Sequence, residues 1–256
     1  MRILITNDDG IFAPGIEALY RAVSDLGHVD VVAPEDAQSA TGHAISVLKP
    51  LLVRRVYVNQ TFHGWSVAGR PADCVKLAML ELLEQRPDFI LSGINAGENT
   101  GINVLYSGTI AGAVEGALFK IPALAFSLEL SDTMDFNMAG RIARSVFDHC
   151  IAARPHAGAC LSVNIPKLER GWPRGVRCCP QAPVNWEEHY RSERDGDGHM
   201  IYWLDGRVPD HHHDCPDSDL AAIKEGYVAI TPLRADLTDR RTLREVAQWT
   251  WPAGFP

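Results

Sequence analysis

The sequence contains no apolar run that approaches the roughly 20 residues required by a membrane-spanning helix, so we expect no membrane segment. The first apolar run, Ile3–Ile5, is short and soon meets two acidic residues, which predicts no signal peptide. Basic charge is also scarce, because 24 Lys and Arg face 32 Asp and Glu, for a formal net charge of −8. Nucleic-acid binding depends on cationic surface, and this balance argues against a general nucleic-acid binder.

Paired metal-binding cysteines are absent as well. None of the six cysteines stands in a C-x-x-C pair, which argues against a structural zinc site. Only Cys178 and Cys179 are adjacent, and vicinal cysteines seldom meet disulfide geometry. We therefore expect six thiols in a reducing compartment, the cytoplasm. The G-x-S-x-G elbow, the Walker A motif and the G-x-G-x-x-G fingerprint are missing too, which removes three familiar enzyme classes.

What the chain does contain is a repeated alternation of strand and helix patterns. Its 256 residues are 46% hydrophobic and 22% charged, which is typical of a soluble globular protein. The periodicity predicts strands at Arg2–Thr6, Asp30–Ala33, Asp88–Ser92, Ala123–Ser127, Leu161–Ile165 and Tyr227–Thr231. It predicts helices at Ile16–Leu26, Pro71–Leu83, Thr109–Phe119 and Met138–Ala153. This alternation indicates an α/β protein with an open, mostly parallel sheet covered by helices on both faces.

Two regions depart from the alternation. Leu51–Val58 and Phe62–Val67 flank a short polar turn, which predicts an inserted hairpin. Pro180–Pro216 shows no amphipathic repeat but carries several aromatic residues, so we expect an arm for self-association or, alternatively, a lid over the site. We accordingly divide the chain into a core of residues 1–180 and an arm with a C-terminal segment, residues 181–256, from which a strand returns near 227–232.

Polar residues follow three of the predicted strands. Asp8 and Asp9 come directly after the first strand, a polar loop containing Ser39 follows the second, and Asn95 follows the strand at Asp88–Ser92. Ligands of open parallel sheets bind beyond the carboxyl ends of the strands. We therefore expect these three segments to meet at one edge of the sheet.

The adjacent acids Asp8 and Asp9 indicate a metal ion. Two neighbouring carboxylates at the end of a buried strand repel each other and lose hydration unless a cation lies between them. Oxygen ligands favour magnesium, manganese or calcium over zinc. The alternative is that one acid caps the following helix while the other faces solvent.

The segment Ser107-Gly108-Thr109 runs into a predicted helix and indicates a phosphate site. Amides at a helix N-terminus, together with two hydroxyls, form a cradle for an anion. The alternative is an ordinary serine or threonine cap. Gly108, Gly112 and Gly116 recur every four residues, which we interpret as close helix packing. Two histidine features carry less weight: we interpret His43 as a surface residue and expect no native metal role for His211–His213.

Taken together, these motifs resemble the SurE family, the stationary-phase survival proteins that are metal-dependent 5′-nucleotidases. The resemblance covers nearly the whole chain, in order. It rests on Ile5–Gly10 with Ala13–Gly15, Val32–Pro34 with Gln38 and Ser39, Ser92–Gly97 with Asn99 and Asn103, Tyr106–Thr109 with Glu115 and Gly116, and Tyr227–Leu233.

The resemblance implies a Rossmann-like core with a β-rich extension used in assembly of a homodimer or homotetramer. It implies one divalent ion per subunit, held by Asp8, Asp9, Ser39 and Asn95, with Asp8 and Asp9 as catalytic residues. It also implies substrate phosphate near Asn95, Ser107, Gly108 and Thr109. The implied reaction is hydrolysis of nucleoside 5′-monophosphates, with 3′-nucleotides and short polyphosphate as further substrates of related members.

One departure from the family pattern concerns Arg70. The family usually has Gly-Thr-Pro where this chain has Gly69-Arg70-Pro71, so a guanidinium that faced the pocket would contact phosphate or base. Two other functions are consistent with the same residues. One is an aspartyl-phosphate phosphatase with Asp8 as nucleophile, and the other is a nucleotide sensor without catalysis.

Overall fold

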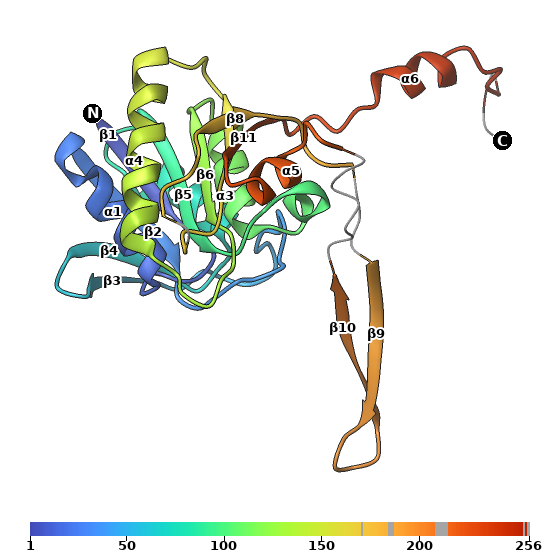
Figure 1. Ribbon diagram of the computed structural model, residues 1–256, viewed down its shortest axis with the longest axis horizontal. Coiled ribbons are helices and arrows are strands. Elements are labelled where there is room, and N and C mark those ends of the chain that lie inside the picture. Colours follow the sequence, from blue (N-terminus) through green and yellow to red (C-terminus); the bar gives the residue numbers. More distant parts are fainter. Residues whose placement is uncertain (170, 184–186, 208–214, 253, 255–256) are drawn as a thin grey trace.

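The computed structural model describes residues 1–169, 171–183, 187–207, 215–252 and 254, and Figure 1 shows a sheet covered by helices on both faces. The strands are β1 Arg2–Thr6, β2 His28–Pro34, β3 Val53–Val58, β4 Phe62–Val67, β5 Phe89–Ala96, β6 Ala123–Leu128, β7 Cys160–Ile165, β8 Val176–Cys178, β9 Glu187–Arg194, β10 Met200–Arg207 and β11 Val228–Leu233. Nine of them form the main sheet in the order β3-β4-β2-β1-β5-β6-β7-β11-β8, and β9 and β10 pair separately. The predicted α/β class is confirmed.

The helices are α1 Pro14–Val23, α2 Pro71–Leu77, α3 Gly108–Leu118, α4 Phe136–Ala153, α5 Asp219–Lys224 and α6 Arg240–Val246. Ile3 and Ile5 of β1 pack in one hydrophobic cluster with residues of α1 and α4. Leu4, between them, packs in a second cluster with residues of α2 and α3. Because successive side chains of a strand point to opposite faces, the apolar run Ile3–Ile5 of β1 supplies both cores.

Parallel pairing aligns the central strands at their carboxyl ends. β1 lies between β2 and β5 and pairs in parallel with both. Ile5 stands opposite Val31, and Thr6 stands opposite Ser92, so the polar residues that follow these strands begin at one level. The strand expected near 227–232 also returns to this sheet, where β11 pairs with β7 in the antiparallel direction.

The inserted hairpin is confirmed at β3 and β4. The two strands pair in the antiparallel direction, and Asn59 and Gln60 between them have positive φ angles of 47° and 57°. Turns with two such residues suit the natural twist of a hairpin. β4 also pairs in parallel with β2, so the hairpin extends the main sheet at one edge.

The predicted β-rich extension is confirmed, because the region without a periodic pattern forms a second hairpin, β9 and β10, which projects from the body (Figure 1). Other features differ from the sequence prediction. The helix expected at Pro71–Leu83 ends at Leu77 and continues as a π-helical turn, Ala78–Leu82. The short elements β8, α5 and α6 have too few residues to show a periodicity.

The histidines at 211–213 lie outside the described residues. Within the described part of the chain, no helix combines the length and hydropathy of a membrane span.

The glycines at every fourth position of α3 bring this helix close to the sheet, as predicted. A Cβ atom on Gly112 would lie 2.9 Å from Ser92 Oγ and 2.9 Å from Thr6 Cγ2. A Cβ atom on Gly116 would lie 2.7 Å from Ile90 Cδ1. Larger residues would therefore push α3 away from β1 and β5.

We expect Gly112→Ala to lower the free energy of unfolding by about 1–3 kcal/mol, because an added methyl group overpacks this contact. Thermal unfolding measures the change. The matched control is Gly196→Ala, where a Cβ atom would meet nothing within 4 Å. Equal melting temperatures for the two variants would contradict the close packing.

Candidate metal and phosphate site

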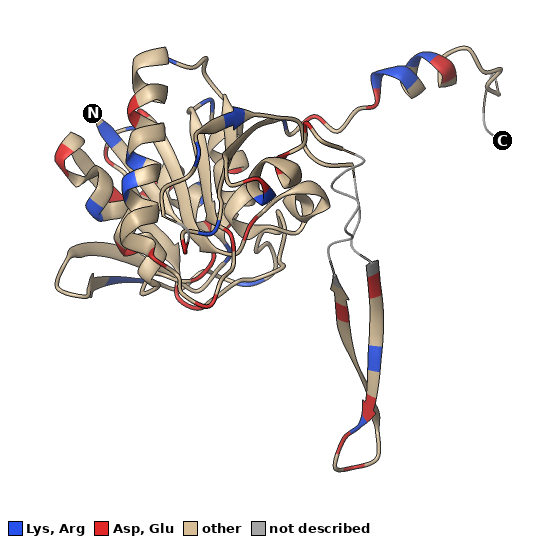
Figure 2. Cartoon of the chain, in the orientation of Figure 1, with Lys and Arg blue, Asp and Glu red and all other residues tan. Residues whose placement is uncertain are grey.

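The loops after β1, β2 and β5 meet at one edge of the sheet, as the sequence predicts. The amide of Gln38 donates to the carbonyl oxygen of Asp8 at 2.7 Å, which joins the loop after β2 to the end of β1. The amide of Ala96 donates to Asp9 Oδ2 at 3.2 Å, which joins the end of β5 to the same point. Figure 2 shows acidic residues in the loops along this edge, the lower one in that view.

Asp8 is buried against the first turn of α3. The Thr109 hydroxyl donates a hydrogen bond to Asp8 Oδ1, and Thr109 itself is fully buried. A Cβ atom on Gly108 would lie 2.7 Å from Asp8 Cβ and 2.9 Å from Asp8 Oδ2. Only glycine at position 108 lets the helix begin this close to the carboxylate.

Both carboxylates are harder to ionise than usual. Burial raises the pKa of Asp8 to about 6, the charge of Asp9 adds to this rise, and the hydrogen bond from Thr109 opposes it. Burial also raises the pKa of Asp9, against the opposing hydrogen bond from the Ala96 amide. A divalent cation between the two acids would relieve their desolvation and their repulsion. The two acids are not splayed into solvent as a cap and a surface residue.

Asn95 precedes Ala96, whose amide donates to Asp9. The Asn95 Nδ2 donates to the Gly97 carbonyl oxygen at 2.7 Å, which leaves the side-chain oxygen as the free acceptor. The pairing of β5 with β6 shifts register between Ser92 and Asn95, so the strand is irregular where it reaches the site. An amide oxygen is a ligand type that suits a hard cation.

Ser39 lies on the loop after β2, and its side chain is exposed. The loop is held by the Gln38 amide on Asp8 and by the Gly42 amide, which donates to the Tyr106 carbonyl oxygen at 2.9 Å. Among the described residues, no hydrogen bond joins Ser39 to Asp8 or Asp9. Ser39 lies on a loop at the same edge of the sheet as Asp8 and Asp9, without a hydrogen bond to either acid, and its role as a metal ligand stays a prediction.

Ser107 caps α3, and the hydroxyl of Thr109 is already hydrogen-bonded to Asp8. Ser107 Oγ accepts a hydrogen bond from the Ile110 amide at 3.1 Å, which is the ordinary capping geometry. The amides of Gly108 and Thr109 belong to the first turn, where a helix offers no acceptor. The Thr109 amide donates to the Asp8 carboxylate, which lowers the pKa of Asp8. The site therefore offers the Gly108 amide to an anion beside Asp8.

A buried ionic network behind the site escaped the sequence analysis. Glu115 of α3 is buried and accepts from Lys76 Nζ at 2.6 Å, and its other oxygen lies 2.8 Å from His43 Nε2. Burial would raise the pKa of Glu115, but the bonds from His43 and Lys76 outweigh it, so the pKa lies below its usual value. His43 is thus more than the surface residue expected, because it ties the Ser39 loop to α3.

Other polar residues of the site loops are structural. Asn99 donates through Nδ2 to Ser127 Oγ at 2.8 Å, and its amide donates to Asn164 Oδ1 at 2.8 Å. Asp219 of α5 is buried and accepts from the Gly101 amide at 3.1 Å. Burial raises the pKa of Asp219, and hydrogen bonds from four backbone amides oppose that rise. These bonds fix the loop between β5 and α3.

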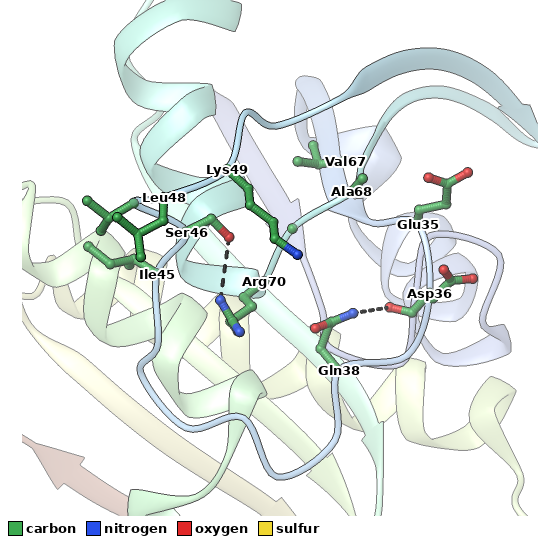
Figure 3. Close-up of a pocket in the computed structure, with 12 residues that line it drawn as sticks. Glu35, Asp36, Gln38, Ile45, Ser46, Leu48, Lys49, Val67, Ala68 and Arg70 are labelled. Atoms are coloured by element: carbon green, nitrogen blue, oxygen red, sulfur yellow. Dashed lines mark hydrogen bonds between the residues drawn. The ribbon is translucent and has the colours of Figure 1, made fainter.

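A cavity of about 590 Å³ lies next to this edge, between the loop after β2 and the start of α2. Arg70 is among its lining residues, as Figure 3 shows. This cavity is lined by none of the candidate metal or phosphate residues, so a contact between Arg70 and substrate stays a prediction. A separate group of potential ligands lies in the turn of the β9–β10 hairpin and consists of Asp195, Asp197 and His199. Asp195 accepts hydrogen bonds from the backbone amides of the other two.

All six cysteines are free thiols, as expected.

Comparisons with known proteins agree with these observations. A family model described as survival protein SurE matches residues 3–188. A 5′-nucleotidase SurE of Heliobacterium modesticaldum is 40% identical over 258 residues, covering 100% of this chain and 94% of that protein. Another, of Desulforudis audaxviator, is 42% identical over 255 residues and covers 97% of each. The crystal structure of the SurE protein from Aquifex aeolicus superposes with a TM-score of 0.80 at 33% identity, covering 96% of this chain and 98% of that one.

We expect Asp8→Asn to stabilise the metal-free protein at pH 7.5 by an amount on the order of 3 kcal/mol. The folded pKa of about 6 exceeds the usual 3.8, so the charged carboxylate destabilises the fold above pH 6 and not below about pH 4. Chemical unfolding with EDTA across pH 4–8 measures the difference.

The control for this experiment is Asp132→Asn, on an exposed loop. Its stability should follow that of the unmodified chain at every pH. A gain for Asp8→Asn that did not grow between pH 4 and pH 6 would contradict the buried-charge interpretation. Manganese should raise the melting temperature of the unmodified chain more than that of Asp8→Asn.

Proposed function

The chain belongs to the SurE family, and from this premise we propose that Asp8, Asp9, Ser39 and Asn95 hold the divalent cation of a 5′-nucleotidase. The chain is a metal-dependent 5′-nucleotidase, a phosphoric monoester hydrolase that releases phosphate from nucleoside 5′-monophosphates. The observation that supports the residue assignment is the adjacent pair of buried Asp8 and half-buried Asp9, whose pKa values are raised by desolvation.

The donor set fits a hard divalent ion. Two carboxylates, one amide oxygen and one hydroxyl are oxygen ligands of the kind that magnesium and manganese prefer, and calcium is also compatible. No cysteine or histidine takes part in this set, which disfavours zinc. When bound, such an ion polarises a phosphoryl oxygen and lowers the pKa of a coordinated water.

The residues of this chain would supply positioning and charge. The Gly108 amide would donate to a phosphate oxygen, with Asn95, Ser107 and Thr109 beside it. Thr109 holds the Asp8 carboxylate in one orientation through its hydrogen bond. One of the two aspartates would accept the proton of the attacking water. Nucleoside 3′-monophosphates and short polyphosphate are proposed as further substrates.

We expect Asp8→Asn and Asp9→Asn each to lower kcat/KM for AMP at least 100-fold with magnesium or manganese, because each removes an anionic ligand. Released phosphate measures the rate, with Asp132→Asn as a control that should keep it. EDTA should abolish turnover in the unmodified chain. Full activity of either variant would show that the substituted residue is not a ligand of the catalytic cation.

The same assay separates the two alternatives. An acid-stable phosphoryl group on Asp8, detected by mass spectrometry during turnover, would identify an aspartyl-phosphate phosphatase. Binding of AMP without any phosphate release would identify a sensor. The relatives named as 5′-nucleotidases support hydrolysis over sensing.

We also propose that residues 181–256 assemble this chain into a homodimer or homotetramer apart from the core of residues 1–180. The β9–β10 hairpin pairs only with itself within the described residues. Its exposed side chains include Tyr190, Tyr202 and Trp203. Aromatic residues of this kind anchor protein interfaces. The six free thiols support a cytoplasmic location.

Replacing Tyr190, Tyr202 and Trp203 together by serine should reduce the mass measured by light scattering, because exposed aromatic area is lost from the interface. Serine at exposed Trp172, in the loop between β7 and β8, is the matched control. An unchanged mass for the triple variant would favour the lid alternative.

A further inference from the structure

The cavity beside the metal centre receives two cationic side chains from different segments. Lys49 comes from the loop after β2, and Arg70 stands at the start of α2. In Figure 3 both side chains point into the space that Gln38 faces from the other side. Its volume of about 590 Å³ lies within the usual range of small-molecule sites.

Arg70 has hydrogen-bond donors to spare. Its Nη1 donates to Ser46 Oγ at a long 3.4 Å, and its Nε is buried without a partner. The carboxylate of Asp73 is already occupied, because it accepts from the Ser46 amide, the Ser46 hydroxyl and the Arg70 amide. Among the described residues, neither Arg70 nor Lys49 forms a salt bridge.

The acids of the cavity do not neutralise these two cations. Glu35 is paired with Arg54, on β3. Asp36 is exposed, and in Figure 3 the carboxylates of Glu35 and Asp36 lie on the side away from Arg70. Two unpaired cations thus face a single unpaired carboxylate, which leaves the Arg70 side of the cavity attractive to an anion.

We propose that this cavity binds the 3′-phosphate of a nucleoside 3′,5′-bisphosphate while the 5′-phosphate occupies the metal site. The inference rests on the proposed function, because it requires the scissile phosphate to lie at Asp8 and Asp9. Water forms a bond to phosphorus as the bond to O5′ breaks, and O5′ ends with one of the water protons. The products are inorganic phosphate and a nucleoside 3′-phosphate.

The strand order supports the spacing between the two sites. β2 lies between β1 and β4, and Pro34 stands opposite Val67 at the end of β4, just before Arg70. Two strand spacings separate the ends of β1 and β4 by roughly 10 Å, part of which the long Arg70 side chain spans. Two phosphates on one ribose bridge such a gap, whereas phosphates joined by a single oxygen are too close together.

A guanine base is a weaker fit to the same cavity. Arginine can donate to O6 and N7 of guanine. However, a neutral base gives no role to the second cation, Lys49. The nonpolar lining consists of small and aliphatic residues without an aromatic ring for stacking. The chemistry favours a dianion, which accepts charge-assisted hydrogen bonds from both side chains.

The test compares kcat/KM for adenosine 3′,5′-bisphosphate with kcat/KM for AMP, using the full chain with manganese. We expect the unmodified chain to prefer the bisphosphate. Arg70→Thr should reduce that preference about tenfold or more through KM, and Lys49→Gln should reduce it less, while AMP turnover is kept. The preference should also fall as salt is added. Arg55→Gln is the matched control, because Arg55 stacks on Trp65 outside the cavity.

Three results would overturn the proposal: equal kcat/KM for both substrates, a preference unchanged by Arg70→Thr and Lys49→Gln, or an effect on the GMP to AMP ratio instead. Lys49 is exposed, so Lys49→Gln keeps the test valid if Arg70→Thr does not fold.

Failure of the proposed function is distinguishable from failure of this proposal, since AMP would then release no phosphate with any divalent ion. Calorimetric binding of the bisphosphate and AMP would still measure the cavity in that case.

Discussion

The contact between the first turn of α3 and the Asp8 carboxylate is the interaction on which the rest of the site depends. Thr109 donates to Asp8, and Gly108 leaves room for the carboxylate where any side chain would collide with it. The same contact brings the first-turn amides of the helix next to the acids, and the Thr109 amide donates to Asp8. The two carboxylates would repel a phosphate bound at the helix N-terminus. A divalent cation shared between the acids and the phosphate would remove that repulsion.

The framework behind this contact holds α3 in place. Gly112 and Gly116 let the helix approach β1 and β5, and the Glu115 network fastens it to α2 and to the Ser39 loop. A helix with larger residues at these positions would stand farther from the sheet and lose the bond to Asp8. The packing of α3 against the sheet therefore offsets the free-energy cost of desolvating the two acids.

Sequence reasoning succeeded where the physical signal is local. β1 and β5 are short apolar runs, and the hairpin of β3 and β4 has a polar turn between two strands. The stripe of glycines in α3 also has a local cause, because a period of four residues marks one helix face. It failed for α5 and α6, which are shorter than two helical repeats. The exposed strands of the β9–β10 hairpin show no apolar alternation, so the family resemblance, and not periodicity, predicted this β-rich extension.

What the sequence alone determined is the alternation of strands and helices, the acids and amides at the strand ends, and the family to which these motifs belong. Only the tertiary structure decided which groups meet. Thr109 binds Asp8 across 101 residues, and His43 binds Glu115 across 72 residues. Arg70 lines the same cavity as Gln38. The reason is physical. Hydrophobic periodicity specifies which face of each element is buried, but side-chain partners across the sheet edge depend on strand order and helix approach, which no local pattern encodes.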